Sequence, residues 1–373
     1  MKHTIKHTMK NSILIRCMFL SCAWILVARA QNPQTEPATT PLARERPAAV
    51  SPANAKPAQE ATSQSAEAGE NDPRLDAIRI IKAAAKPRPI RLLVVGAHPA
   101  DVFDQSGGTM AHHIERGDWV GCAVMTTGVR VHATAVTNEL KGSNETDETE
   151  KLKEIMAERA QAKEQEVVKA CSLLGVRAED IHFLRADDAV LLVNEPMIRQ
   201  LSRLIRQLRP DDLITHFPLE NSGLGAHAIT GMMVIHALEL AGGEDPGEKR
   251  PPHRVAQVFF FGIGAAAVRG DLWSSQGGFY NDVFVDITDV AAKKVACLDA
   301  MASQGYAGAY ARKRIDSSDA AFGSRVRVPY AEGFITLHSS VHYYLPVSPI
   351  DLEHARSSDR TSVLRKSFRV TVP

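Results

Sequence analysis

The sequence predicts an α/β fold in which a mostly parallel sheet carries helices on both faces. Two observations support this prediction. Short, mostly continuous apolar runs rich in β-branched residues alternate along the chain with longer segments whose apolar residues recur at helical spacing. Glycine or proline stands at several of the boundaries between these segments. Such alternation is typical of βαβ units, whose strands lie parallel in one sheet.

The expected strands are apolar over most of their length, which indicates strands buried on both faces. They span residues 90–96, 120–127, 180–184 and 213–216. A later apolar run contains Phe259, Phe260 and Phe261. We interpret this run as a further core strand rather than as an aromatic stacking platform.

The expected helices span residues 107–116, 157–174, 195–208 and 226–240. Gly175 follows the second of these helices, at the position where glycine commonly ends a helix. Pro210 stands just beyond the third helix, whose apolar residues fall on one face. In parallel sheets of this kind a ligand binds at the carboxyl ends of the strands, so functional residues are expected there.

The amino-terminal sequence indicates export. Residues 1–30 combine a basic leader, an uncharged apolar run and small residues at the two positions that a signal peptidase reads. An uncleaved membrane anchor is the alternative. Residues 31–75 are rich in Pro, Ala, Gln, Ser, Thr and Glu, which predicts a disordered linker. We therefore expect a periplasmic or secreted protein, without a stable membrane span after cleavage, whose folded domain covers residues 76–348 before a tail over 349–373.

The charge balance argues against a nucleic-acid-binding protein, and the cysteine spacing argues against disulfides. Lysine and arginine total 44 and aspartate and glutamate 43, so the chain lacks the basic excess of a nucleic-acid-binding protein. Cys122, Cys171 and Cys297 remain after the expected signal peptide. They are odd in number, widely spaced and surrounded by apolar residues, so we expect buried free thiols rather than disulfides.

Polar residues follow two of the expected strands at their carboxyl ends. His98 and Asp101 come directly after the first strand. His216 ends the fourth strand, and His227 begins the next helix after a glycine-rich loop. Two imidazoles and one carboxylate from separate loops would leave positions on a metal ion open for water and substrate, as in catalytic zinc sites. Taken alone, a His-x-x-Asp pair after a strand is also common as a hydrogen-bonded loop feature.

Short motifs surround these positions in a specific order. They are Gly96-Ala97-His98-Pro99-Ala100-Asp101, Gly107-Gly108-Thr109, Lys163 with Glu166, Phe183-Leu184 before Asp188, Arg209-Pro210-Asp211, Asp286-Ile287-Thr288, Ser303-Gln304 and Ala331-Glu332. Together they resemble the PIG-L/LmbE-like zinc-dependent N-acetylglucosaminyl deacetylases over about residues 90–335. The resemblance implies a Rossmann-like, three-layer LmbE-like sandwich, a Zn²⁺ cofactor, and a small-molecule or glycan substrate that carries an N-acetylated sugar.

The resemblance also assigns roles by position. The zinc ligands of the family fall on His98, Asp101 and His227. Asp188 matches the aspartate of the family's Phe-Leu-Gly-x-x-Asp turn and is an expected substrate-binding residue. His216 ends a strand beside the site, so we expect it either to bind substrate or to be a hydrogen-bonded structural histidine. The general base of the family falls on Ala100, whose methyl group can neither accept nor donate a proton. The metal-binding residues are therefore complete while the acid–base residues are not.

Three interpretations of Ala100 remain open. Another carboxylate takes over proton transfer, with Asp104 and Glu220 as the expected catalytic residues and Asp188 as a third candidate. The leaving group needs less help than an amine does, as in ester or glycosidic chemistry. Or the protein binds metal and glycan without turnover. The expected function is an exported zinc-dependent de-N-acetylase of an amino sugar or glycoconjugate, and the alternative is a metal-binding, glycan-recognising protein. The sequence names neither the sugar nor the oligomeric state.

Overall fold

The computed structural model describes residues 88–130, 148–220, 225–262, 280–342, 345–367 and 369. The expected signal peptide and linker lie outside the described residues. Among the described helices, none is both long enough and apolar enough to cross a membrane.

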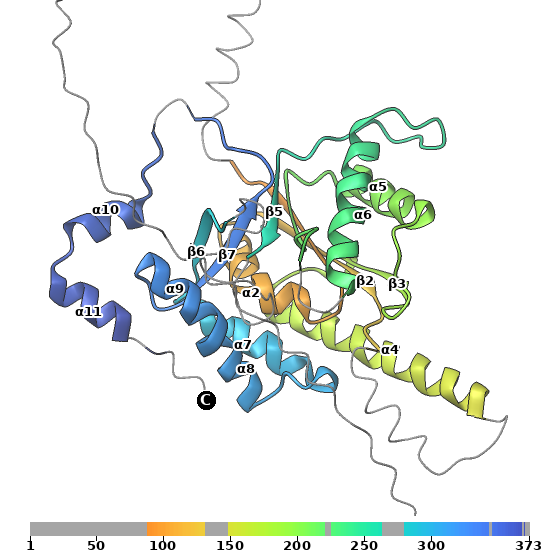
Figure 1. The fold of residues 1–373 in the computed structure, drawn as a ribbon, viewed down its shortest axis with the longest axis horizontal. Helices are drawn as coiled ribbons and strands as arrows, with labels where there is room; N and C mark the ends of the chain where they lie inside the picture. The colour runs from red at the N-terminus through yellow and green to blue at the C-terminus, as the bar shows by residue number, and fades with distance from the viewer. Residues whose placement is uncertain are drawn as a thin grey trace, which may run out of the picture. The chain divides into compact units, whose positions relative to one another are not determined.

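A mixed sheet of seven strands, in the order β3-β2-β1-β4-β5-β7-β6, forms the centre of the described residues (Figure 1). Its strands are β1 (Arg91–Gly96), β2 (Trp119–Thr126), β3 (Ile181–Ala186), β4 (Asp212–Thr215), β5 (Gln257–Phe261), β6 (Val283–Asp286) and β7 (Ala331–Thr336). The strands from β3 to β5 are parallel, and β7 pairs antiparallel with both β5 and β6. The predicted mostly parallel α/β sheet is confirmed.

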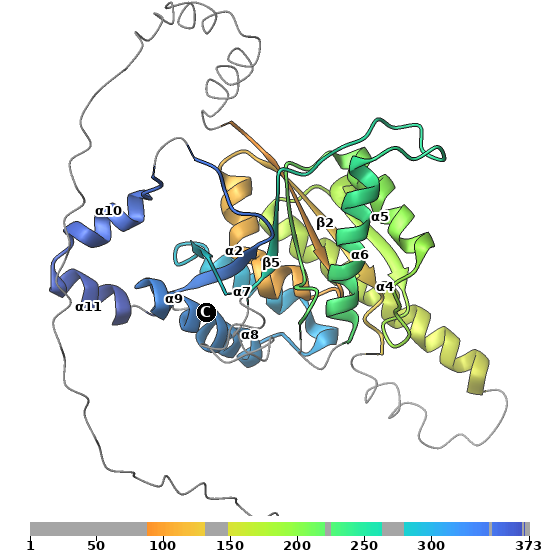
Figure 2. The ribbon, with the colours of Figure 1, turned by 45° about the horizontal axis from the view of Figure 1, so that its top comes forward.

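Helices cover both faces of this sheet, as Figure 1 and Figure 2 show. They are α2 (Asp101–Glu115), α4 (Glu148–Leu174), α5 (Glu195–Leu208), α6 (Gly225–Gly242), α7 (Ala291–Ala300), α8 (Ala309–Arg314), α9 (Ala320–Val326), α10 (Pro349–Arg356) and α11 (Asp359–Ser367). Leu92 and Val94 of β1 pack in one apolar cluster with α2, α4 and α7. Leu93 and Val95 pack in a second cluster with α5 and α6. Both faces of β1 are therefore buried, which explains its continuous apolar sequence.

Most of the predicted elements are found within a residue or two of their expected bounds. The helix over 195–208 is α5, capped by the side chain of Asn194, and the phenylalanine run lies in β5. Two helices begin earlier in the chain than the sequence predicts. Helix α2 begins at Asp101 and bends at Ser106. Its first turn, before the bend, contains the polar residues Asp101 and Asp104, which in the sequence resemble a loop. Helix α4 begins at Glu148, in a charged stretch without a clear apolar face.

The structure also tests the predictions for the cysteines and for the carboxy-terminal segment. Cys122, Cys171 and Cys297 are free and buried, as expected. The segment after residue 348, expected only as a tail, contains α10 and α11.

The site is positioned by the order of the central strands. β1 lies between β2 on one side and β4 on the other, so the chain reverses its direction of travel across the sheet at β1. Val94 pairs with Cys122 of β2 and with Ile214 of β4. The loops after β1 and β4 consequently diverge at their carboxyl ends, which is where α/β sheets bind ligands.

The carboxy-terminal elements support α2 through buried charges. Lys294 of α7 is 1% exposed, and its Nζ lies 2.9 Å from Oδ1 of Asp319 and 2.8 Å from Oε1 of Glu332. The Glu332 carboxylate also accepts the backbone N–H groups of Gly108 and Thr109, at 2.9 and 2.7 Å, just after the bend in α2. This ion network joins α7, β7 and α2 inside the protein.

We expect Lys294→Met to lower the free energy of unfolding by about 3–5 kcal/mol, because Asp319 and Glu332 would stay buried without their shared cation. Urea denaturation followed by circular dichroism measures this change. Lys293→Met is the matched control. Lys293 pairs with Glu115 at the surface, where an ion pair contributes about 0–1 kcal/mol. Equal unfolding midpoints for the two variants would contradict the assigned role of Lys294.

Candidate metal centre

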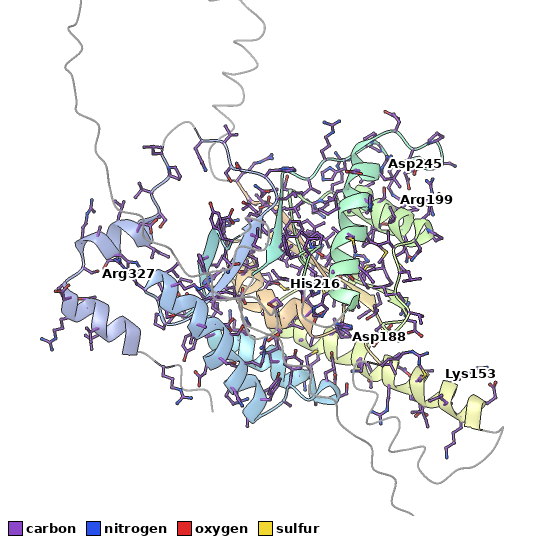
Figure 3. All side chains as sticks on the ribbon, in the orientation of Figure 1. Lys153, Asp188, Arg199, His216, Asp245 and Arg327 are labelled. Atoms are coloured by element: carbon purple, nitrogen blue, oxygen red, sulfur yellow. The ribbon has the colours of Figure 1, made fainter. Side chains whose placement is uncertain are left out.

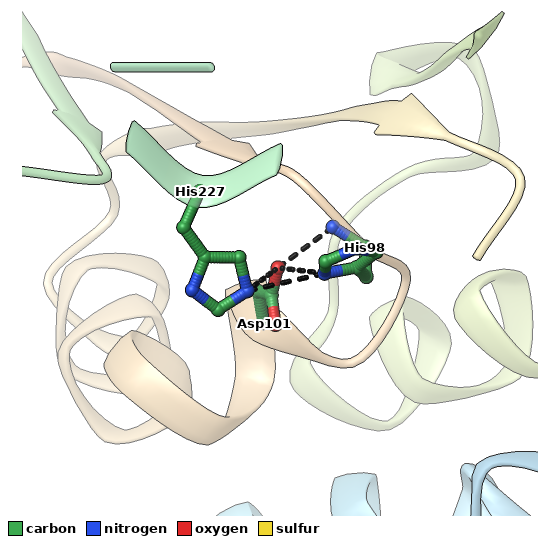
Figure 4. Close-up of side chains that lie close together, drawn as sticks. All are labelled: His98, Asp101 and His227. Atoms are coloured by element: carbon green, nitrogen blue, oxygen red, sulfur yellow. Dashed lines mark hydrogen bonds and ion pairs between the residues drawn. The ribbon is translucent and has the colours of Figure 1, made fainter. Parts of the chain in front are cut away.

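The three predicted metal ligands converge at the carboxyl ends of β1 and β4 (Figure 4). His98 and Asp101 lie in the turn from β1 into α2, and His227 lies in the first turn of α6. Nδ1 of His98 is 3.1 Å from Nε2 of His227 and 3.2 Å from Oδ2 of Asp101. Nε2 of His227 is 3.4 Å from the same carboxylate oxygen. All three side chains are buried.

The spacing of this triangle suits a metal ion. A tetrahedral ion with bonds of about 2.0–2.2 Å places its ligand atoms about 3.3–3.6 Å apart. The three ligand atoms are 3.1, 3.2 and 3.4 Å apart, so one distance falls in this range and two lie about 0.1–0.2 Å below it. Imidazole nitrogen and carboxylate oxygen are also ordinary ligands for divalent transition metals. The residues present therefore fit a divalent ion and leave further coordination positions for water or substrate.

Backbone contacts hold the turn that carries His98 and Asp101. The backbone N–H of His98 donates to Oδ2 of Asp101 at 2.7 Å, which closes the turn. The chain before it is fixed to β2, because the Thr126 hydroxyl donates to the carbonyl of Ala97 at 2.7 Å. Gly128 has a φ of +65°, and a Cβ there would lie 2.7 Å from Cδ of Pro99. The site thus needs glycine at 128 for the loop after β2 to pass the ligand turn.

His216 and Glu220 lie directly behind the ligands. The His216 ring stacks on the His227 ring, with centroids 4.1 Å apart, and its Nε2 lies 3.1 Å from Oδ2 of Asp101. The Glu220 carboxylate lies between the two rings, with Oε1 2.6 Å from Nδ1 of His227 and Oε2 3.1 Å from Nδ1 of His216. His216 is 1% exposed and lies near the middle of the view in Figure 3. Both residues therefore contact metal ligands.

The electrostatics of the site favour a cation. Burial raises the pKa of Glu220, but the hydrogen bonds and charges of His216 and His227 outweigh it and bring this pKa to about 2. Burial lowers the pKa of His227, but Asp101 and Glu220 outweigh it and raise this pKa to about 10. Without metal, a proton on His227 offsets one of the two negative charges of Asp101 and Glu220. A metal ion would take the place of that proton.

The other predicted catalytic carboxylate, Asp104, has a different partner. Asp104 lies in the first turn of α2, and the Arg314 guanidinium approaches both of its oxygens, with Nε 2.9 Å from Oδ1. Gln105 donates a further hydrogen bond to Oδ2, at 3.1 Å. The pair with Arg314 is buried, so the Asp104 carboxylate is neutralised by a guanidinium rather than directed to the ligand triangle.

Ala100 lies at the start of α2 and is 2% exposed, within the apolar cluster on the α2 face. Its backbone N–H donates to Oε1 of Gln304 at 3.2 Å. The neighbouring Ser303 donates to Glu166 of α4 through its hydroxyl at 2.8 Å. Position 100 is therefore tied through η2 (Ala302–Gln304) to helix α4.

Asp188 and Lys163 lie within electrostatic range of each other. Asp188 follows β3, and its Oδ2 accepts the backbone N–H of Arg130 at 2.9 Å. Figure 3 shows it close to α4. Lys163 of α4 is 3% exposed, and its Nζ has no hydrogen-bond partner among the described residues. Burial lowers its pKa to about 8, against the opposing charges of Glu166 and Asp188. A buried ammonium group without a partner is suited to an incoming polar ligand.

Sequence reasoning missed Arg314 and Gln304 as parts of this region. Each contacts the α2 turn across more than two hundred residues of chain, and no local pattern marks either contact. The Ser303-Gln304 motif was the available signal for Gln304. No comparable signal precedes Arg314.

We expect wild-type protein to hold about one zinc ion per chain and His227→Ala to lose most of it, because two ligands bind a metal far more weakly than three. Metal content after dialysis, measured by mass spectrometry, gives the result. His236→Ala is the matched control, since this histidine lies on the same helix with an exposed side chain. Loss of metal from the control, or full retention by His227→Ala, would exclude the triangle as the metal site.

Comparison with known proteins finds a family match for part of the chain. Residues 93–238 match the PIG-L family model, described as GlcNAc-PI de-N-acetylase. A 1D-myo-inositol 2-acetamido-2-deoxy-alpha-D-glucopyranoside deacetylase from Segniliparus rotundus is 26% identical over 257 residues, covering 57% of this chain and 77% of the relative.

Solved structures share the fold. The 4-carboxy-2-hydroxymuconate hydratase GalB from Pseudomonas putida KT2440 aligns with a TM-score of 0.55 and 21% identity over 69% of this chain and 100% of that one. The N,N'-diacetylchitobiose deacetylase from Pyrococcus horikoshii aligns with a TM-score of 0.51 and 19% identity over 66% and 83%. These likenesses concern the fold. The match to the family model confirms the predicted resemblance: residues 93–238 of the chain form a PIG-L family domain.

Proposed function

We propose that the protein is an exported zinc-dependent hydrolase that removes the acetyl group from an N-acetylated amino sugar or a glycoconjugate. The observation that carries the proposal is the buried triangle of His98, Asp101 and His227, whose spacing suits a divalent metal ion. The match to the PIG-L family model and the deacetylase relative from Segniliparus rotundus support the acetylated sugar as substrate.

The chemistry follows from the donor set. Zinc bound by these residues would polarise an acetyl carbonyl and lower the pKa of water at an open coordination position. His98 and His227 contribute imidazole nitrogens and Asp101 contributes a carboxylate oxygen. The part of the protein is to hold these three atoms at the required spacing, since catalysis depends on preorganised geometry.

Proton transfer is the weak point of the proposed reaction. Ala100 offers no proton acceptor. Asp104 is neutralised by Arg314, and both oxygens of Glu220 face imidazole N–H groups. A carboxylate held by such charge-assisted bonds is a poor general base, because it would have to give up those bonds to take a proton. We therefore propose slow amide hydrolysis in the wild-type protein.

The absence of a proton acceptor at Ala100 favours a second candidate function. A metal-binding protein that recognises an N-acetylated glycan without turnover would keep the ligand triangle and would not need a base at position 100. In either case we propose that Asp188 belongs to the substrate-binding region. His216, expected from the sequence to bind substrate, is 1% exposed and both of its ring nitrogens face protein groups, so it supports the candidate ligands instead. Lys163, whose buried ammonium group lies within electrostatic range of Asp188, extends this region toward α4.

Export is proposed on the pattern of residues 1–30, whose basic leader, apolar run and small residues are typical of a cleaved signal peptide. We expect the mature periplasmic or secreted protein to begin near Gln31. Amino-terminal sequencing of protein from each cell fraction measures this. An intact leader on membrane-bound protein would favour the anchor interpretation instead.

We expect Ala100→Asp to raise the kcat/KM for N-deacetylation by about a hundredfold, because a carboxylate at this position would restore general base catalysis. Acetate release from a panel of N-acetylated sugars gives the rate, and zinc content is measured on the same samples. Ala100→Asn is the control, since it matches the size of aspartate but cannot act as a base. A lower rate for Ala100→Asp than for wild type would show that another group already serves. Zinc-loaded wild type and Ala100→Asp that are both inactive on every sugar would favour the glycan-recognising alternative.

A further inference from the structure

Glu220 occupies a fixed and buried position behind the metal ligands. It lies a few residues beyond β4, and its backbone N–H donates to the carbonyl of Phe217 at 2.9 Å, which closes a turn. Its side chain is 1% exposed. Both carboxylate oxygens face imidazole nitrogens, Oε1 toward His227 and Oε2 toward His216. The residue therefore contacts the candidate metal site through histidine rings.

Two groups of side chains around His227 have ligand atoms close enough to share a metal ion, and their distances separate them. The first contains His98, Asp101 and His227, and the second contains His216, Glu220 and His227. In the second group, Oε1 of Glu220 lies 2.6 Å from Nδ1 of His227. Two ligands of one tetrahedral ion lie about 3.3–3.6 Å apart, whereas 2.6 Å suits a charge-assisted hydrogen bond. The second group is thus a hydrogen-bonded support for the first.

This contact determines which nitrogen of His227 is free. An ionised carboxylate only accepts hydrogen bonds, so Nδ1 of His227 must carry the proton that it donates to Glu220. In the ring without extra charge, Nε2 then has the free lone pair. Nε2 is the atom that faces His98 and Asp101, at 3.1 and 3.4 Å.

The same argument applies to His216. Its Nδ1 lies 3.1 Å from Oε2 of Glu220 and must donate to it. Its Nε2 then accepts the backbone N–H of Ala97, at 3.1 Å. The same Nε2 lies 3.1 Å from Oδ2 of Asp101, the oxygen that accepts the N–H of His98 and would bind the metal ion. Ala97 directly precedes His98 in the ligand turn. Glu220 therefore fixes one ring that would bind metal and a second ring that holds the turn carrying the other ligands.

We propose that Glu220 is a positioning residue whose carboxylate sets the protonated nitrogen of both His227 and His216 and so prepares the triangle of His98, Asp101 and His227 for a metal ion. Carboxylates that accept the second N–H of a ligand histidine typically contribute about 10–100-fold to metal affinity. The inference rests on the proposed metal site but not on the deacetylation reaction. It also gives Glu220 a role other than that of general base.

Glu220→Gln tests the proposal directly. The amide keeps the size of the side chain, but it has one acceptor oxygen and one donor nitrogen where the carboxylate has two acceptors. One of the two imidazoles must then face an N–H group. Since a metal on Nε2 keeps the proton of His227 on Nδ1, we expect the amide oxygen to face His227 and the amide nitrogen to face His216. The proton of His216 should move from Nδ1 to Nε2.

Two measurements follow this change. Competition with a chromophoric chelator gives the zinc affinity, which we expect to fall about 10–100-fold in Glu220→Gln. Nitrogen-15 NMR of histidine-labelled, zinc-loaded protein gives the protonated nitrogen of each ring, with signals assigned from single-histidine replacements. Glu220→Asp keeps the charge but is one methylene shorter, so we expect it to recover part of the affinity. Glu239→Gln is the matched control, because Glu239 lies on α6 with an exposed side chain, and it should leave both readouts unchanged.

The outcomes are distinct. Reduced zinc affinity together with a changed proton position on His216 supports the proposal. Unchanged affinity in Glu220→Gln, or reduced affinity with both Nδ1 protons still in place, overturns it. If circular dichroism shows that Glu220→Gln does not fold, Glu220→Asp carries the same test. In that variant, a zinc affinity equal to that of the wild type together with loss of the Nδ1 proton from either ring overturns the proposal. Wild-type protein that binds no zinc would refute the proposed metal site and this role of Glu220 together, whereas zinc binding that Glu220→Gln leaves unchanged would refute the role of Glu220 alone.

Discussion

The parallel pairing of β1 with β4 is the constraint on which the site depends. These neighbours in the sheet are separated by more than a hundred residues of chain, and the turn after each carries part of the candidate metal centre. Asp101 is the point where they meet. Its Oδ2 accepts the N–H of His98 and lies within 3.4 Å of ring nitrogens from both His216 and His227. A fold that separated β1 from β4 would place these side chains at different parts of the sheet edge, and no ion could bridge them.

Helix α2 transmits the support of the carboxy-terminal elements to this turn. Its first turn carries Asp104, whose carboxylate pairs with Arg314 from α8. After the bend in α2, the backbone N–H groups of Gly108 and Thr109 donate to Glu332 from β7. Buried ions of this kind cost free energy unless they are paired and hydrogen-bonded. The elements after β5 therefore help to hold the turn that carries His98 and Asp101 in place.

The fold alone does not decide the reaction. A hydratase and a deacetylase both share it at about 20% identity with this chain, so function has to be argued from the site. Here the ligand triangle agrees with the family, whereas position 100 does not. Ala100 is packed in an apolar cluster, and the nearby carboxylates are committed to Arg314 or to imidazoles. The geometry that suits a metal ion is therefore more complete in this chain than the set of groups that would move protons beside it.

The sequence by itself determined the central strands and the helices between them. Through the family resemblance it also predicted the three residues of the ligand triangle and an alanine, Ala100, at the position expected for the general base. These features are local: apolar periodicity is read over a few turns, and His98 and Asp101 are three residues apart. The antiparallel placement of β6 and β7, the pairing of Asp104 with Arg314 and the position of Glu220 between two histidines were decided only by the tertiary structure. Hydrogen bonds and ion pairs between distant segments leave no periodic signal in the sequence, because a buried charge needs a partner in space and not at any particular spacing along the chain.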